Sequence, residues 1–125
     1  MNINVEKLNP AMDFIKATLK DGLLTCEIWD RETGLSFLSH NPQPVGVALF
    51  TEVTKTLATA LSDSGFPSLN RYYLVDLEGT HLAMVILHGN DILQGLIMNS
   101  KKVNLGILLS IVLPKAIEFI EKART

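Results

Sequence analysis

Cysteine is nearly absent from this 125-residue chain, which contains only Cys26. A single cysteine cannot form a disulfide within the chain or hold a zinc ion by itself, so the disulfide-stapled and zinc-ribbon classes of small protein are excluded. This scarcity fits a reducing compartment, and we expect a cytoplasmic protein. Because Cys26 alternates with Leu24 and Ile28, we interpret it as a packed thiol and not as a nucleophile.

The chain also lacks an excess of charge and a long hydrophobic run. The 11 Lys and Arg residues face 13 Asp and Glu residues, and the formal net charge is -2. Nucleic-acid-binding domains need a basic surface, so we expect no nucleic-acid partner. The most apolar stretch, residues 105–113, is interrupted by Gly106 and Ser110 and falls short of the ~20 residues of a membrane span. Residues 1–20 lack the apolar centre of a signal peptide, so we expect neither secretion nor membrane insertion.

Motifs that bind phosphates, dinucleotides or metals are missing as well. The sequence contains no Gly-x-x-x-x-Gly-Lys-Ser/Thr element and no glycine fingerprint at a strand-to-helix turn. His81 and His88 are an odd number of residues apart on one predicted strand, which places them on opposite faces. Asp76 and Glu78 fit a solvated turn better than an acid/base pair. We therefore expect no cofactor, no metal site and no enzymatic activity.

Apolar residues, by contrast, are abundant enough to build a core. They make up 47% of the chain, against 19% charged residues, and the length fits a single domain over residues 1–125. Asn9 and Pro10 predict the N-cap and the first residue of a helix that stops at Asp21-Gly22. Its apolar spacing continues backwards, so residues 1–9 are either a helical extension or a flexible arm.

Alternation of apolar and polar residues predicts strands over residues 23–29, 35–39, 71–77, 81–88 and 92–98. The first strand should be covered on one face only, with Leu24, Cys26 and Ile28 buried and Thr25 and Glu27 outside. The fourth strand is apolar on both faces, so helices should cover both sides of the sheet.

Two longer helices complete the expected order α-β-β-α-β-β-β-α. Apolar residues at helical spacing predict a helix over residues 45–61, and Gly65 should mark its end. Residues 105–124 predict the last helix, in which Pro114 should cause a kink because proline removes a backbone hydrogen bond. The expected fold class is α+β, an antiparallel sheet with helices on both faces.

The later part of the chain carries a more specific pattern. Tyr72–Gly79 is followed by an apolar strand, by the turn Gly89-Asn90-Asp91, by a second apolar strand and by Lys102–Gly106 at the start of the last helix. This pattern resembles the roadblock family of dynein-light-chain-like domains, and its bacterial MglB-type members in particular. The chain departs from the family pattern in its longer first turn, Asp30–Gly34, and in Pro114.

Roadblock domains are similar to profilin and longin folds. The resemblance implies a five-stranded antiparallel sheet in the order 2-1-5-4-3, with the middle helix on one face and the terminal helices on the other. It also implies dimers in which the third strands pair edge to edge and the middle helices pack together. In this sequence the implied interface consists of Tyr72, Tyr73, Leu74 and Val75 in the third strand and Leu49, Phe50, Val53 and Leu57 in the middle helix. Bacterial members usually serve small Ras-like GTPases without doing chemistry, so the resemblance implies a homodimeric scaffold or regulator of such a GTPase.

The third strand favours this interpretation independently, because residues 71–77 contain no Pro or Lys that would blunt a sheet edge. Tyr72 and Tyr73 must face opposite sides of the sheet, and both core packing and partner contact stay open for them. If this edge forms the dimer, Tyr73→Lys should give a monomer by placing like charges in a desolvated seam.

A hypothesis of a different class is a small-molecule sensor with a pocket between sheet and helix. Only Gln94 and His88 offer polar groups at interior strand positions for such a pocket. Arg31 and Arg71 raise a separate idea, since an arginine supplied in trans is one way to accelerate GTP hydrolysis. Most arginines in turns are simply solvated, so we assign this catalytic role to neither arginine. The non-catalytic scaffold stays the leading interpretation.

Overall fold

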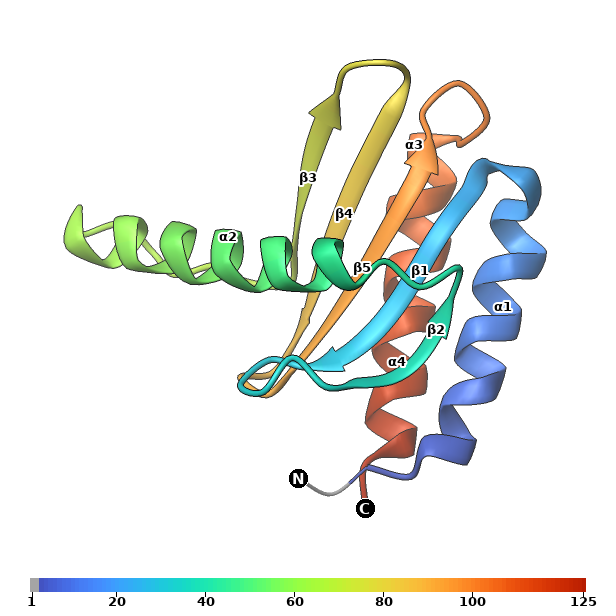
Figure 1. Cartoon of the computed structure of the whole chain (residues 1–125), viewed down its shortest axis with the longest axis horizontal. Coiled ribbons are helices and arrows are strands. Elements are labelled where there is room, and N and C mark those ends of the chain that lie inside the picture. Colours follow the sequence, from blue (N-terminus) through green and yellow to red (C-terminus); the bar gives the residue numbers. More distant parts are fainter. Residues whose placement is uncertain (1–2) are drawn as a thin grey trace.

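Five antiparallel strands form one sheet in the order β2-β1-β5-β4-β3. The computed structural model describes residues 3–125 (Figure 1). Its strands are β1 (Leu23–Asp30), β2 (Ser36–His40), β3 (Tyr72–Leu77), β4 (His81–His88) and β5 (Ile92–Asn99). The predicted α+β class and strand order are confirmed.

Helices cover both faces of the sheet, as predicted. They are α1 (Asn9–Leu19), α2 (Pro44–Asp63), α3 (Leu105–Ile107) and α4 (Leu113–Ala123). In Figure 1, α1 and α4 lie on one face while α2 crosses the other. The largest cluster of buried residues, which includes Met84 and Leu96, lies on the α1/α4 face. A second cluster, which includes Trp29 and Phe50, lies under α2, and a third contains Ile28 of β1 and Ile120 of α4. Among residues 3–125, no helix is both long enough and apolar enough to span a membrane.

The prediction for β1 is wrong at Leu24. Leu23 pairs with Met98 and Thr25 with Ile97, so Leu24 is the extra residue of a β-bulge and is 36% exposed. Because of the bulge, Leu23 and not Leu24 joins Cys26 in the core of the α1/α4 face.

The second face of β1 is covered too, contrary to the expectation of a half-buried strand. Thr25 and Glu27 are buried on that face, and the Glu27 carboxylate accepts a hydrogen bond from the backbone N–H of Gln43 just before α2. The sequence pattern does not reveal this cover, because α2 reaches β1 from a distant part of the chain.

Trp29 anchors α2 on the sheet. Its indole Nε1 donates to Thr51 Oγ1 of α2 at 2.9 Å. The ring lies over Gly95 of β5, where a Cβ would be only 3.0 Å from Trp29 Cη2. The absence of a side chain at Gly95 therefore leaves room for the indole.

The start of α1 differs from the prediction, because Asn9 is not its N-cap. A 3-10 helix, Val5–Leu8, runs directly into α1, so Asn9 already has helical dihedral angles (φ -58°, ψ -46°). The capping residue is Asn4, whose side chain accepts from the N–H of Glu6 at 3.1 Å. The Asn4 N–H donates to the carbonyl of Ala123 at 2.7 Å, which ties this segment to the end of α4. Residues 1 and 2 of the expected arm lie outside the described residues.

The last helix changes its hydrogen-bond pattern just before Pro114, where the sequence predicts a kink. A π-helical turn, Leu108–Val112, separates α3 from α4. Proline has no N–H, and its ring crowds the carbonyl four residues earlier, which accounts for a local change at this point. Asn104 caps the start of α3 by accepting from the N–H of Ile107 at 3.0 Å.

Candidate functional site

β3 is a free edge of the sheet, because within residues 3–125 it pairs only with β4. The N–H of Leu87 donates to the carbonyl of Arg71 at 2.8 Å, which marks these two residues as a hydrogen-bonded pair. Hydrogen-bonded and non-hydrogen-bonded pairs alternate along an antiparallel ladder, so Tyr72, Leu74 and Asp76 belong to the non-hydrogen-bonded pairs. The backbone N–H and C=O groups of these three residues therefore point away from β4. β3 therefore presents a row of N–H and C=O groups to a strand that arrives from outside.

The strand residues predicted for the interface all lie on this edge, and all are half-buried. Tyr72 and Leu74 face the core under α1 and α4, whereas Tyr73 and Val75 face the core under α2. The prediction that the two tyrosines face opposite sides is confirmed. Each contributes to the core of its own chain and keeps some surface at the edge.

Tyr73 also connects the edge strand to α2. Its hydroxyl lies 2.8 Å from Thr54 Oγ1, and Thr54 Oγ1 donates to the carbonyl of Phe50 at 2.6 Å. Because the threonine proton is used in that way, the tyrosine O–H is the donor to Thr54. Burial raises the pKa of the Tyr73 hydroxyl above its usual value, which keeps the proton that this hydrogen bond needs.

α2 carries an apolar stripe that its own sheet leaves partly open. Leu49, Val53 and Leu57 recur every four residues, with Val45 before them and Leu61 after them, and residues four apart lie on one side of a helix. Val45 is 80% and Leu49 52% exposed, while the other three are half-buried. Three of the four predicted helix residues thus share one continuous surface. Val45 and Leu61 extend it and were not predicted, although their spacing is visible in the sequence.

The fourth predicted helix residue, Phe50, lies elsewhere. It is 9% exposed and packs in the core beneath α2, in one cluster with Val47 and Trp29. One step along a helix rotates a side chain by about 100°, so Phe50 points toward the sheet while Leu49 points away from it. Phe50 therefore supports the fold and offers little surface to a partner.

Only the first half of α2 rests on the sheet. Its buried residues are Val47, Phe50 and Thr54, and none follows Thr54 among its 20 residues. Figure 1 shows the cause, since α2 continues past β3 and its C-terminal end projects beyond the sheet. Residues 55–63, here termed the projecting half of α2, therefore carry Leu57 and Leu61 on a segment that its own sheet does not fully support.

The residues considered for catalysis offer no activated group. Cys26 is fully buried, and burial raises the pKa of its thiol to about 12, so the thiolate needed for nucleophilic attack does not form near neutral pH. Asp76 and Glu78 are exposed at the end of β3, as expected of a solvated turn. Within the described part of the chain, no three His, Cys, Asp or Glu side chains gather to hold a metal ion.

Two cavities bear on the alternative of a small-molecule sensor. The cavity between the sheet and α2, bordered by Trp29 and Phe50, has a volume of about 30 Å³, which is room for about one water molecule. A cavity of about 510 Å³ lies instead at the end of the sheet, where Arg31, Arg71 and His88 are among its lining residues.

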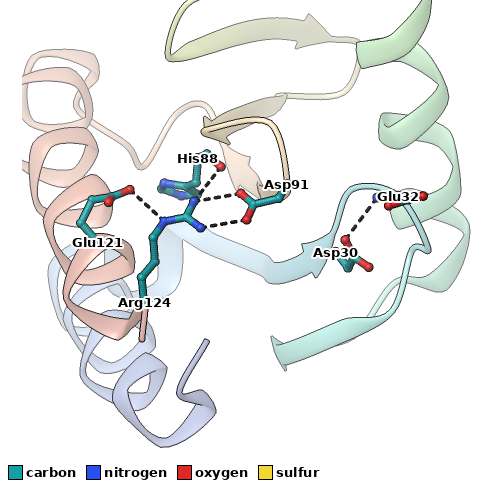
Figure 2. A network of polar contacts seen from close by, with 6 residues as sticks. All are labelled: Asp30, Glu32, His88, Asp91, Glu121 and Arg124. Carbon is teal, nitrogen blue, oxygen red and sulfur yellow. Dashed lines mark hydrogen bonds and ion pairs between the residues drawn. The ribbon is translucent and has the colours of Figure 1, made fainter. Parts of the chain in front are cut away.

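A polar cluster closes the end of the sheet next to the larger cavity (Figure 2). The Arg124 guanidinium contacts both carboxylate oxygens of Asp91 at 2.9 Å and donates to the carbonyl of His88 at 3.0 Å, while its Nε donates to Glu121 at 3.2 Å. Arg124 thereby holds the pKa of the Asp91 carboxyl below its usual value. His88 Nε2 lies 2.8 Å from Gln94 Oε1, and burial lowers the pKa of the imidazole to about 4.

Comparison with solved structures identifies the architecture. A Roadblock/LC7 domain from Streptomyces avermitilis matches with a TM-score of 0.55 and 12% identity, covering 88% of this chain and 92% of that one. MglB from Myxococcus xanthus matches with a TM-score of 0.78 and 13% identity, covering 94% of this chain and 87% of that one. This chain has the roadblock fold. The gliding protein MglB from Thermus thermophilus shares that roadblock fold, with a TM-score of 0.72 and 15% identity over 94% of this chain and 93% of that one. No protein-family model and no curated protein sequence matches the chain.

In this roadblock fold, the third strand lies at the sheet edge and the middle helix extends past it. These are the two elements that the resemblance assigned to the interface, and their role as an interface stays a prediction. Sequence reasoning missed the bond between Thr54 and Tyr73, because no local pattern links a helix residue to a strand that follows it much later.

Proposed function

We propose that this protein is a non-catalytic homodimer that serves a small Ras-like GTPase as a scaffold or regulator. The observation that carries the proposal is an open edge strand beside a helix whose apolar stripe runs past that edge. The roadblock fold supports it, because the roadblock resemblance implies dimers of this kind with GTPase partners. One MglB structure similar to this chain is described as having a tetrameric arrangement, which supports self-association here.

A two-fold axis at the β3 edge would pair the open edge strand and cover the apolar stripe of α2 at the same time. Two β3 strands would pair antiparallel through the outward backbone groups of Tyr72, Leu74 and Asp76, giving one continuous sheet and leaving neither edge open. Each projecting half of α2 would then extend over the partner's sheet. Burial of Leu57 and Leu61 in that position would stabilise the dimer through the hydrophobic effect.

Proline at Asp76 tests the strand pairing. The Asp76 side chain is exposed and its N–H points away from β4, so proline there removes an outward donor and leaves the β3–β4 hydrogen bonds in place. We expect light scattering to give a dimer for the natural protein and a monomer for Asp76→Pro. Tyr73→Lys is a less specific test than the sequence suggests, because it also removes the hydrogen bond to Thr54 within the same chain.

A glutamate at Leu57 tests the helix contact. In a two-fold dimer, Leu57→Glu would bury a charge from each protomer in an apolar seam, and we expect the dimer to dissociate at least about tenfold more readily. Thr59→Glu is the matched control, because it adds the same charge to an exposed position of the same projecting half. A dimer that persists in both Asp76→Pro and Leu57→Glu would show that this edge is not the interface.

GTPase binding is tested with a Ras-like GTPase encoded in the same genome, loaded with GDP or with a non-hydrolysable GTP analogue. A complex that forms only with the GTP-like state fits a partner that reads the switch regions, which order around the γ-phosphate. If the protein is a dimer and the GTPase binds in neither state, the dimer part of the proposal holds and the GTPase part is wrong.

A further inference from the structure

The cavity at the end of the sheet, with its volume of about 510 Å³, is large enough for a small molecule. It lies where the chain from α2 enters β3 and where β4 turns into β5. Part of its wall is apolar and comes from Leu69, Leu87 and Ile117, which belong to three different segments. The rest is polar, and Arg31 and Arg71 are among its residues.

The two arginines reach this cavity from two strands that are not neighbours in the sheet, β1 and β3. Arg31 follows β1, and its N–H donates to the carbonyl of Asp91 at 2.9 Å. Arg71 precedes β3, and its carbonyl accepts from the N–H of Leu87 at 2.8 Å. Both backbone contacts are made to the hairpin of β4 and β5, so this hairpin brings the two side chains to one cavity.

Among residues 3–125, the ion pairs are formed by other basic side chains, so neither the Arg31 nor the Arg71 guanidinium is paired with a carboxylate there. The carboxylate on the cavity wall, Glu121, already pairs with Arg124 at 3.2 Å, and Arg124 pairs with Asp91 as well. The wall therefore carries an excess of positive charge. An anion placed between the arginines would bind both, and guanidinium groups suit phosphate and carboxylate oxygens because they can donate two parallel hydrogen bonds.

His88 adds an unused hydrogen-bond acceptor. The Gln94 amide nitrogen faces Cys26 Sγ at 3.8 Å, so its oxygen faces His88 Nε2, which must donate to it. His88 Nδ1 is then the bare acceptor nitrogen, and it is buried without a partner in the described chain. Buried polar atoms almost always have partners. The ring points toward α4, whose Ile117 and Glu121 line the same cavity (Figure 2).

We propose that this cavity binds a small molecule that carries a phosphate or carboxylate group on an apolar body. Arg31 and Arg71 bind the anionic group, and the apolar wall contacts the body of the ligand. The cavity lies next to the proposed dimer interface, but its lining includes none of Tyr72, Leu74 and Asp76, and the site does not depend on the GTPase proposal.

Titration calorimetry on the full chain at low salt tests the site with defined probes. Phenyl phosphate and phenylacetate both have an apolar body and differ in the anionic group, and inorganic phosphate lacks the body. We expect saturable binding of phenyl phosphate or phenylacetate, whichever carries the preferred group, and at least about tenfold weaker binding of inorganic phosphate, since the apolar wall contributes to affinity.

Charge-removing variants locate the site. Arg31→Gln and Arg71→Gln should each weaken binding of the better probe about tenfold or more, and the double variant should abolish it. Lys55→Gln is the matched control, because it removes one positive charge from an exposed position of α2 outside the cavity. Neither arginine side chain forms an ion pair with a carboxylate of the described chain, so we expect these variants to keep a melting temperature close to the natural one.

Two results would overturn the proposal. One is the absence of saturable binding of either aromatic probe up to about 10 mM. The other is equal affinity of the natural protein and the double arginine variant. If the double variant instead loses only a protein partner in the GTPase experiment, the arginines dock an acidic protein side chain and the small-molecule proposal is wrong.

Discussion

Acidification from about pH 7.5 to about pH 5 should lower the free energy of unfolding by about 2 kcal/mol through one side chain, His88. This histidine is 2% exposed, is the last residue of β4, and directs its ring toward α4 (Figure 2). Burial disfavours the charged imidazolium and lowers the pKa to about 4, and the nearby positive charge of Arg124 acts in the same direction. The hydrogen bond to Gln94 and the negative charges of Glu121 and Asp91 oppose this lowering without reversing it.

The size of the effect follows from proton linkage. In the unfolded chain the imidazole gains its proton near the ordinary value of 6.5, whereas in the folded protein it resists protonation until about pH 4. Between these values the unfolded state binds more protons, so stability falls as the pH falls. Each pH unit in this window costs about 1.4 kcal/mol, and about 1.5 units separate pH 6.5 from pH 5, which gives about 2 kcal/mol.

Urea unfolding of the natural protein at the two pH values measures this difference. His88→Gln should be less stable at both values but should lose most of the pH dependence, because glutamine does not titrate. His81→Gln is the matched control, since His81 begins the same strand with an exposed side chain and its variant should keep the full drop. The window stops at about pH 5 because carboxylates protonate below it. A natural protein whose stability changes by less than about 0.5 kcal/mol, or an equal drop in His88→Gln, would refute the reasoning.

Three further predictions concern packing and reactivity. Gly95→Ala should destabilise the protein by about 1–3 kcal/mol in urea unfolding, because the new Cβ would push against the Trp29 ring. The control is Gly46→Ala, whose Cβ would meet its nearest neighbour at 3.4 Å and which should be neutral or stabilising. Equal losses of stability in the two variants would contradict this account. The thiol of Cys26 should react with a chromogenic disulfide reagent only as the chain unfolds, whereas rapid labelling of the folded protein would mean that the site opens. Arg124→Gln should lower the free energy of unfolding by about 1 kcal/mol, because it removes the ion pair with Asp91 in the β4–β5 turn. An unchanged thermal melt would show that this ion pair does not contribute to stability.

Much of the secondary structure could be predicted from the sequence because it depends on local signals. The turn at Gly89–Asp91 and the alternation on either side of it place β4 and β5 within one residue of their observed bounds. The two-sided apolar pattern of β4 correctly predicts helices on both faces of the sheet. These signals act between residues that are near neighbours in the chain, so no knowledge of the tertiary structure is needed to interpret them.

The errors arise where one local signal competes with a contact from elsewhere. Asn9 has the chemistry of an N-cap, but the backbone contact between Asn4 and Ala123 extends the helical segment past it. Leu24 fits the alternation of β1, yet the bulge against β5 turns it outward and places Leu23 in the core. The roadblock resemblance assigned Phe50 to the helix contact, but Phe50 packs against the sheet beneath α2 and is buried there.

The sequence by itself determined the elements and the two-layered helix cover, because periodicity, turn residues and apolar content are properties of short segments. It also marked residues 71–77 as a strand without the residues that protect an edge. Only the tertiary structure decided that this strand stays at the edge, that α2 projects past it, and that Arg31 and Arg71 meet at one cavity. These features depend on the order of the strands and on contacts between distant segments, and the residues of any single segment do not specify them.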